Sequence, residues 1–384
     1  MTGPNSCAAA DKLARGMSST RGGAGGRRGG HRAPTITSHD VARAAGVSQS
    51  TVSRVLRNDP RISEATRERV LAAARELRYV PSEVGRSLVT RSTRTIGIVV
   101  TDLTSMFYPY LIAPLHEEVD ASDYRMVLFT EGVETFEEEA GPAVSPTRRA
   151  LDPLLDRLLD RSLDGVVLTT SRLDGTLSAE LARASLPFVF LTRYAGGVAA
   201  DSAVVDNSLG ASLAASEAVR LGHTRFGAIF GPPDTSTGRD RARGVRVALT
   251  SAGLELPDTM VRHGPFSFET GYVQMTELLA QKPRPTVVLC SNDTVAIGAF
   301  NAARALGLGV PQDVSLVGFD DLPMAGWEVF SLTTVHQPME EMARTAVRLL
   351  IERIEGKVET SSVRQRMFEP HMVFRRTLAP PPAA

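Results

Sequence analysis

Three polar side chains in the short segment QSTVSRVL, residues 49–56, are of the kinds that read DNA: Gln49, Ser50 and Arg54. Amide and hydroxyl groups form hydrogen bonds with base edges, and a guanidinium group makes a bidentate contact with guanine or binds a phosphate. The apolar residues of the segment repeat at helical spacing, and Ser48 before it is a good helix N-cap. We therefore expect a helix that presents Gln49 and Ser50 in its first turn and Arg54 one turn later.

A second group of polar side chains follows apolar segments in the long remainder of the chain. These residues stand at the ends of the segments: Asp102, Thr170, Arg193, Asn292, Asp293, Asp320 and Asp321. Carboxylate, hydroxyl, amide and guanidinium groups together can bind a polar small molecule. The adjacent Asp320 and Asp321 could instead act as a pair of catalytic acids. The chain has no G-x-x-x-x-G-K-[ST], no G-x-S-x-G and no G-x-G-x-x-G after a strand, which disfavours the enzyme classes that carry these motifs.

Helices on both sides must position residues 49–56. Thr37 and Asp40 can form a reciprocal cap at the start of a preceding helix, and Gly46 permits a tight turn after it. A third helix is expected from about Ser63 to Tyr79, with an inward face formed by Val70, Leu71, Ala74 and Leu77. The first two helices have the spacing of a helix-turn-helix DNA reader. On spacing alone, a plain three-helix bundle explains the pattern equally well.

Apolar, strand-like segments alternate with helical segments from Thr95 onward. The expected strands lie within residues 94–102, 124–132, 164–171, 186–193, 226–233, 286–293 and 314–321. Such an alternation indicates parallel sheets that are covered by helices on both faces. Ligands of these sheets bind beyond the carboxyl ends of the strands, which is where the polar residues of the second group stand.

Charge is divided unevenly along the chain, although the total is balanced at 43 basic and 43 acidic residues. Residues 1–94 hold 17 Lys+Arg and 7 Asp+Glu, which leaves 26 basic and 36 acidic residues for the remainder. This predicts that only the basic front meets a polyanion.

With Cys7 and Cys290 as the only cysteines, no disulfide framework or metal spacing is available. There is no apolar run of membrane-spanning length and no signal peptide, so we expect a cytoplasmic protein without a membrane partner, metal or cofactor.

The string D-V-A-R-A-A-G-V-S-x-x-T-V-S-R-V-L, from Asp40 to Leu56, closely resembles the DNA-binding domain of the LacI/GalR family of bacterial transcription regulators. The sequences RYVP and GRSL that follow it fit the same family. LGHTRFGAIFG (221–231) and VPQDVSLVGFDD (310–321) resemble the family's sensor core, which is similar to periplasmic sugar-binding proteins. The resemblance covers roughly residues 36–378.

This resemblance implies an N-terminal all-α helix-turn-helix domain with a hinge helix, followed by an α/β two-lobed periplasmic-binding-protein-like effector domain with parallel sheets. The expected divisions are a disordered tail at 1–34, the DNA-binding domain at 35–80, the hinge helix and linker at 81–94, the effector-binding and dimerisation domain at 95–378 and a tail at 379–384. The lobes should be discontinuous, with about 95–194 and a helix near 338–356 in the first. The rest, including a closing strand near 367–376, should form the second.

The resemblance also assigns candidate site residues. DNA contacts are expected at Thr37, Ser48, Gln49, Ser50, Thr51, Ser53, Arg54 and Leu88. Effector contacts are expected at Phe107, Tyr108, Arg193, Arg241, Phe266, Asn292 and Asp320. In the family, the hinge leucine, here Leu88, wedges into the minor groove and bends the operator. Gly85 stands where the family usually has alanine, which lowers the intrinsic stability of the hinge helix.

We therefore expect a ligand-responsive, sequence-specific DNA-binding regulator that acts as a repressor. It should bind a near-palindromic operator as a homodimer and sense a small molecule, a sugar or derivative, in the cleft between the lobes. An activator of the same family is one alternative. A solute-binding protein of a transporter is another, but it would need a secretory signal and would have no use for residues 40–56.

Overall fold

The computed structural model describes residues 36–56, 59–79, 92–131, 146–160 and 162–382. The chain divides into two compact units, residues 1–82 and 83–384. The predicted tail at 1–34 and most of the predicted hinge, with Gly85 and Leu88, lie outside the described residues.

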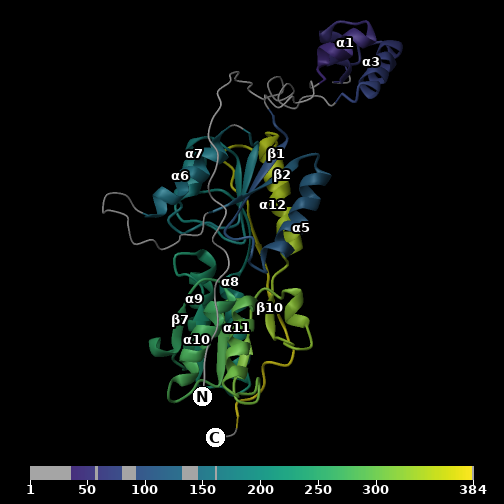
Figure 1. Cartoon of the computed structure of the whole chain (residues 1–384). Coiled ribbons are helices and arrows are strands. Elements are labelled where there is room, and N and C mark those ends of the chain that lie inside the picture. The colour runs from purple at the N-terminus through teal and green to yellow at the C-terminus, as the bar shows by residue number, and fades with distance from the viewer. Residues whose placement is uncertain (1–35, 57–58, 80–91, 132–145, 161, 383–384) are drawn as a thin grey trace, which may run out of the picture. The chain divides into compact units, whose positions relative to one another are not determined.

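The first unit contains the three expected helices, α1 (Ser38–Ala45), α2 (Gln49–Leu56) and α3 (Glu64–Glu76) (Figure 1). The Asp40 carboxylate accepts hydrogen bonds from the Thr37 backbone N and hydroxyl at 3.0 and 2.7 Å, so the predicted cap forms. Gly46 ends α1 at a φ of 64°, a left-handed conformation that glycine adopts without steric cost. The turn between α1 and α2 therefore forms as the sequence predicts.

The helices enclose a small core of Val41, Ala42, Ala45, Val52, Val55, Val70, Ala73 and Ala74. The inward face predicted for α3 was partly wrong. The Leu71 side chain is 40 % exposed, while Ala73 is buried in its place. The helix also stops at Glu76, with Leu77 as its C-cap.

A six-stranded parallel sheet organises the first lobe of the second unit. Its strand order is β11-β5-β4-β3-β1-β2. The strands are β1 (Thr95–Val100), β2 (Arg125–Thr130), β3 (Gly165–Leu168), β4 (Phe188–Leu191), β5 (Asp201–Val205) and β11 (Gln365–Phe368). Apolar side chains of α5 (Tyr108–Ala121) and α12 (Met339–Ile354) pack on one face. Those of α6 (Pro146–Leu159) and α7 (Thr176–Arg183) pack on the other.

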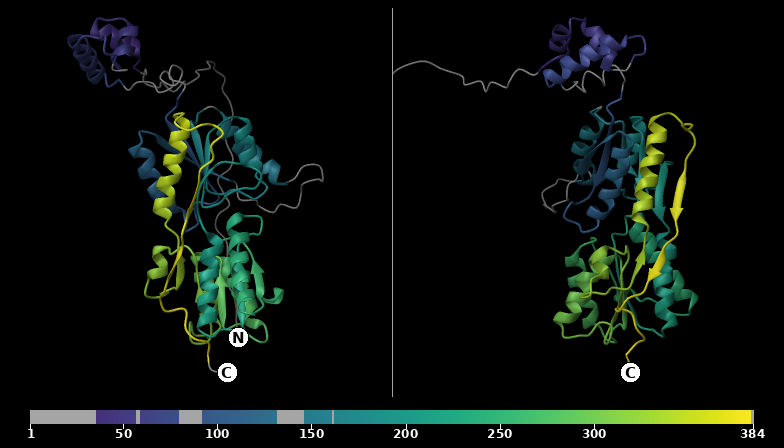
Figure 2. Two further views of the ribbon diagram at one scale, coloured as in Figure 1. Left: turned by 180° about the vertical axis from the view of Figure 1, so that it is seen from behind. Right: turned by 90° about the vertical axis from the view of Figure 1, so that its right-hand side faces the viewer.

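A four-stranded parallel sheet of order β7-β6-β8-β9 organises the second lobe (Figure 2). Its strands are β6 (Phe226–Phe230), β7 (Val261–His263), β8 (Val287–Cys290) and β9 (Ser315–Val317). The helices α8 (Asn207–Arg220) and α9 (Ser236–Ser251) cover one face, and α10 (Phe268–Ala280) and α11 (Asp293–Ala305) cover the other. Short 3₁₀ helices are η1 (Asp258–Met260) and η2 (Pro323–Gly326).

The chain passes between the lobes after β5, between β10 (Thr334–His336) and α12, and between β11 and β12 (His371–Val373). Strands β10 and β12 pair with each other in antiparallel fashion. The predicted extent of the first lobe was therefore too short, because β5 and β11 both belong to its sheet. The segment predicted as one closing strand near 367–376 is divided between β11 and β12, since the chain crosses from one lobe to the other there.

Candidate functional site

The exposed side of α2 carries the predicted base-reading side chains. Gln49, Ser50 and Arg54 are exposed, whereas Val52 and Val55 on the opposite side are buried. The Gln49 amide donates a 3.3 Å hydrogen bond to Ser38 Oγ on α1. The helix therefore presents three donors or acceptors on one face, as a recognition helix requires.

The remaining predicted DNA contacts have other structural roles as well. Ser48 caps α2, because its Oγ accepts a 3.2 Å hydrogen bond from the Thr51 backbone N. Thr51 and Ser53 are partly buried, and the Thr37 hydroxyl is directed to Asp40. The Thr37 hydrogen bonds lower the pKa of Asp40 below its ordinary value. Leu88 lies outside the described residues.

A cavity of about 380 Å³ lies between the two lobes of the second unit. All seven side chains predicted to contact an effector line it, namely Phe107, Tyr108, Arg193, Arg241, Phe266, Asn292 and Asp320. Most of its lining follows the carboxyl ends of parallel strands from both sheets. Thr101 and Asp102 follow β1, Thr169 and Thr170 follow β3, Arg193 follows β4, Asn292 follows β8 and Asp320 follows β9.

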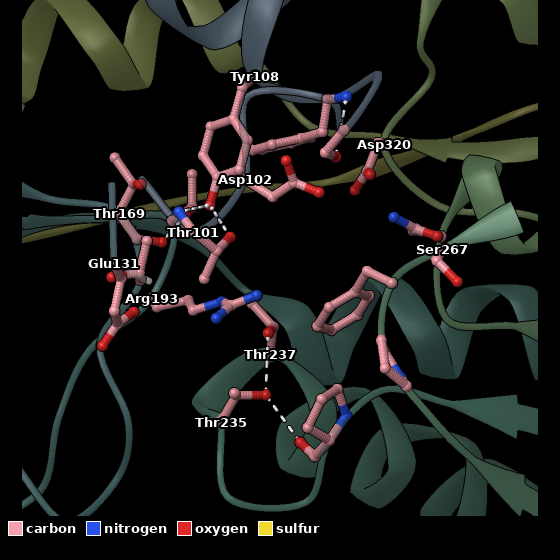
Figure 3. A pocket seen from close by; sticks show the side chains of 18 of the residues that line it. Thr101, Asp102, Tyr108, Glu131, Thr169, Arg193, Thr235, Thr237, Ser267 and Asp320 are labelled. Carbon is pink, nitrogen blue, oxygen red and sulfur yellow. Dashed lines mark hydrogen bonds between the residues drawn. The ribbon is translucent and has the colours of Figure 1, made fainter. Parts of the chain in front are cut away.

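Figure 3 shows how the labelled side chains surround this space. Thr101 and Tyr108 lie on one side, Thr235 and Thr237 lie on the opposite side, and Arg193 extends between them. The edges of two parallel sheets face each other here, so residues distant in sequence converge on one volume. A ligand in the cavity therefore contacts both lobes.

A buried ion pair lies in the cavity wall. Arg241 Nη2 and Asp320 Oδ1 are 3.3 Å apart, and their side chains are 7 % and 3 % exposed. Arg241 also donates to Asn207 Oδ1 at 2.7 Å and to the Ser291 carbonyl at 2.5 Å, and its guanidinium carbon is 3.6 Å from the Phe319 ring centre. These contacts hold the guanidinium in one orientation, and Asp320 Oδ1 accepts from both Arg241 Nη2 and the Gln337 amide.

Burial sets the ionisation of this pair. Burial raises the pKa of Asp320 from 3.8 to about 6, although Arg241 and hydrogen bonds from neighbouring amides lower it. Burial likewise lowers the pKa of Arg241, against the attraction of Asp320. Behind the cavity wall, burial and then the charge of Asp320 raise the pKa of Asp293 well above its ordinary value. At neutral pH Asp320 is therefore ionised in the cavity wall, and this ionisation lowers the free energy of unfolding.

Aromatic rings form another part of the wall. The Arg193 guanidinium carbon lies 5.2 Å from the Phe266 ring centre, and the rings of Phe107 and Tyr108 meet edge to face with centres 5.6 Å apart. The Tyr108 hydroxyl and Thr101 Oγ1 are 2.7 Å apart. A Cβ added at Gly231 would come within 2.2 Å of the Phe266 ring, so glycine is needed at this position for the ring to lie where it does. The wall thus combines an apolar ring face with fixed polar groups.

Two strand-end candidates do not face the cavity. Asp293 is fully buried and accepts hydrogen bonds from the Leu322 backbone N and the Thr334 hydroxyl. Asp321 instead pairs with Arg375 at 2.7 Å and with His336 at 3.0 Å. Asp320 and Asp321 therefore point to different surroundings, and this separation does not support their use as paired catalytic acids.

Sequence reasoning missed several cavity residues. The Gln337 amide donates a 2.7 Å hydrogen bond to Asp320 Oδ1, and Thr235 and Thr237 come from the start of α9. Gln337 follows β10, a strand too short to be recognised from its sequence pattern. Within the described part of the chain, the buried Thr170 Oγ1 in the wall has no hydrogen-bond partner. A polar ligand or water would satisfy it.

The described residues form neither a metal-binding cluster nor a membrane-spanning helix. No group of three or more His, Cys, Asp and Glu side chains among them is arranged to hold a metal ion. None of the helices built from these residues has the length and apolar character needed to cross a membrane.

Both units resemble domains of known proteins. The family of bacterial regulatory proteins of the lacI type matches residues 37–82, and the periplasmic binding protein-like domain matches residues 215–378. The ribose operon repressor of Haemophilus influenzae is 33% identical over 343 residues, which cover 89% of this chain and 98% of the repressor. The chain therefore belongs to the LacI family of bacterial regulatory proteins.

Solved structures show the same fold. The complex of the transcriptional regulator CelR with cellobiose is 32% identical, with a TM-score of 0.66, and the match covers 89% of this chain and 99% of CelR. The Lac repressor dimer bound to operator and the anti-inducer ONPF is 27% identical, with a TM-score of 0.77, and the match covers 89% of this chain and 98% of the repressor chain. The predicted helix-turn-helix and the two-lobed parallel-sheet domain are thus confirmed.

Proposed function

We propose that this protein is a transcriptional repressor whose binding to an operator is controlled by a small polar effector. One observation carries the proposal. The cavity gathers all seven predicted effector residues in a chain that also carries a lacI-type recognition helix. A solute-binding protein would share the cavity but would have no need for α2. The relatives named above are regulators of transcription, which supports the same assignment.

The cavity chemistry favours a sugar or a similar polyol as the effector. The ionised Asp320 accepts hydrogen bonds from hydroxyl groups, while Arg193 and Asn292 can donate to hydroxyl oxygens. Phe266 supplies the apolar ring face that the flat C–H side of a sugar ring needs. Relatives that are named for ribose or bound to cellobiose fit this chemistry.

We further propose a homodimer on a near-palindromic operator. Two recognition helices related by a two-fold axis read two half-sites about one helical turn apart, or multiples of it. The Lac repressor dimer bound to its operator offers a structural precedent for this arrangement. Gln49, Ser50 and Arg54 are the residues expected to reach base edges, with Leu88 as the minor-groove wedge.

The start of the second unit couples effector binding to operator binding. Asp164, just before β3, accepts hydrogen bonds from the Thr93 and Arg94 backbone N atoms at 2.7 and 2.9 Å. The chain that leads to the hinge is thus fixed to the first lobe. When the effector changes the angle between the lobes, it moves this anchor and favours or disfavours docking of the hinge on DNA. Such coupling is reciprocal and is usually worth about 1–3 kcal/mol.

A thermal-shift screen of sugars, nucleosides and their phosphates tests the proposal, because a ligand that binds only the native state raises its stability. Hits are then titrated in the presence and absence of an operator fragment selected from random DNA. We expect a polyol to bind and its affinity to differ between the two titrations. Equal affinity with and without operator would refute the coupling. Failure to select any specific DNA would refute the repressor assignment itself.

A further inference from the structure

A hydrogen-bonded cluster joins the two lobes just outside the cavity. Tyr194 follows β4 in the first lobe, and its hydroxyl donates to Asp240 Oδ2 on α9 of the second lobe at 2.6 Å. The same hydroxyl accepts from Arg239 Nη2 at 2.7 Å, and the Arg239 guanidinium carbon lies 5.7 Å from the Tyr194 ring centre. We call Tyr194, Arg239 and Asp240 the interlobe clasp.

Other interlobe hydrogen bonds come from the backbone of Tyr194 and from the loop after β3. The Tyr194 backbone N donates to Ser236 Oγ at 3.0 Å. The Leu173 backbone N donates to the Asp234 carbonyl at 2.8 Å, and Arg172 Nη1 donates to Asp234 Oδ2 at 2.8 Å. The loops after β3 and β4 are therefore held against the start of α9 by several hydrogen bonds.

The clasp is next in sequence to the cavity wall but is not part of it. Arg193 precedes Tyr194, and Arg241 follows Asp240; both arginines line the cavity. None of the three clasp residues is among the described residues that line it. A change confined to the Tyr194 hydroxyl can therefore affect a bound ligand only through the arrangement of the lobes.

The charges of the clasp allow it to open. The Asp240 side chain is 7 % exposed, so its hydrogen bond to Tyr194 is poorly screened by water. Asp240 Oδ1 also accepts from Arg239 Nε at 3.0 Å, a contact within the second lobe. If the lobes separate, Asp240 keeps this guanidinium and is not left as an unpaired buried charge. Burial raises the pKa of Tyr194, so its hydroxyl remains a donor throughout the physiological range.

We propose that the interlobe clasp holds the lobes closed over the cavity, so that Tyr194 is a positioning residue for the effector. The inference rests on the proposed function, because it assumes that the effector binds between closed lobes. It goes further in assigning part of the control of closure to the Tyr194 hydroxyl. Apparent effector affinity should then be proportional to the fraction of molecules whose lobes are closed.

The test measures closure without any ligand. Spin labels are attached at Ala182→Cys on α7 and Ala280→Cys on α10, two exposed positions in different lobes, in a Cys7→Ser background of the full chain. Labelled protein is mixed with excess unlabelled protein, so that each labelled dimer carries one labelled protomer. Tyr194→Phe removes only the clasp hydroxyl. We expect it to raise the ratio of long to short interlobe distances about tenfold, the effect of losing a hydrogen bond to a charged group.

Tyr272→Phe is the matched control, because it removes an exposed tyrosine hydroxyl from α10 in the second lobe. It should leave the distance distribution unchanged. Asp240→Asn keeps the size of the clasp acceptor but removes its charge, and it should shift the distances in the same direction as Tyr194→Phe. If circular dichroism shows that Tyr194→Phe does not fold, the interlobe distances of Asp240→Asn test the proposal instead. Unchanged distances in the folded clasp variant overturn the proposal, whether or not any sugar binds.

Ligand affinity provides the second readout. D-ribose and cellobiose are titrated into the wild-type protein and Tyr194→Phe as probes. For a probe that binds, the apparent Kd should rise by the ratio of the closed fractions given by the distances. A fall in the closed fraction with no such rise would overturn the role of closure in effector affinity. If neither probe binds the wild-type protein, that result counts against a sugar of these two types, and the distances alone decide whether the clasp exists.

Discussion

Replacing Asp320 with asparagine should stabilise the protein increasingly as the pH rises. The Asp320 side chain is 3 % exposed, and burial raises its pKa from 3.8 to about 6 in the folded protein. An acid whose pKa is higher in the folded state than in the unfolded state favours folding most when protonated. Its contribution is therefore full below the unfolded pKa and is lost as the pH rises toward the folded pKa.

The size of the effect follows from these two values. Each tenfold change in proton affinity corresponds to about 1.4 kcal/mol. The difference between 3.8 and about 6 therefore makes ionisation of Asp320 cost about 3 kcal/mol of folding free energy. The amide introduced by Asp320→Asn does not ionise, so this variant resembles the protonated wild type at low pH and avoids the cost at neutral pH. Arg241 stays in both proteins, and removal of the Asp320 charge also lowers the pKa of the neighbouring Asp293, which that charge raises.

Urea denaturation of the wild-type protein and Asp320→Asn at a series of pH values measures the difference. We expect the free energy of unfolding of Asp320→Asn, relative to the wild type, to rise by about 2 kcal/mol between about pH 4 and about pH 7, most of the full cost of ionisation. Asp258→Asn, which removes a carboxylate that is 96 % exposed, controls for the loss of one surface charge. If the difference in unfolding free energy between Asp320→Asn and the wild type stays constant across this pH range, burial does not raise the pKa of Asp320 as argued.

Four further changes test the two sites. Arg54→Ala should cost about 1–3 kcal/mol of binding free energy at one or two operator base pairs, measured by gel shift on substituted operators; an equal loss on every sequence would show that Arg54 binds only phosphate. Leu88→Ala should lower operator affinity and reduce DNA bending in a circular-permutation assay, and unchanged bending would reject its role as a wedge. Gly231→Ala should force the Phe266 ring, 2.2 Å from the added Cβ, to move at a cost of about 1–3 kcal/mol in stability, and should weaken effector binding; an unchanged Kd by calorimetry would contradict this. Ser48→Ala should destabilise the first unit by about 1 kcal/mol through loss of the α2 cap, and hydrogen exchange of α2 unaltered by the change would argue against it.

Local patterns were sufficient for the helices of the first unit and for most strands of the second. Thr37 with Asp40, Gly46 and Ser48 form their caps and turn between neighbours in sequence, so the necessary information is local. Leu71 shows where this reasoning failed. Leu71 is next to Val70 on the predicted inward face, but the small three-helix core buries Ala73 together with Val70 and Ala74 and leaves the Leu71 side chain exposed.

The composition of the cavity was partly predictable for a general reason. Parallel strands end at the same edge of a sheet, so Asp102, Thr170, Arg193, Asn292 and Asp320 could be expected there before any contact was known. Asp293 and Asp321 stand at the same strand ends but turn away. Which of two adjacent carboxylates faces the cavity depends on backbone angles and on partners such as Arg375, which lies 54 residues further along the chain.

By itself, the sequence determined the kinds of secondary structure, the lacI-type reading helix and the identity of several cavity side chains. The secondary structure and the polar residues at strand ends follow from spacing, caps and turns, which act over short distances in the chain, whereas the reading helix and the other cavity residues follow from the family resemblance. Only the tertiary structure decided the limits of the lobes, the hydrogen bond from Gln337 to Asp320, and the clasp between Tyr194 and Asp240. The physical reason is that all three features depend on where the chain crosses between the lobes. The residues that meet at a crossing are separated in sequence by intervals that no helix or strand periodicity predicts.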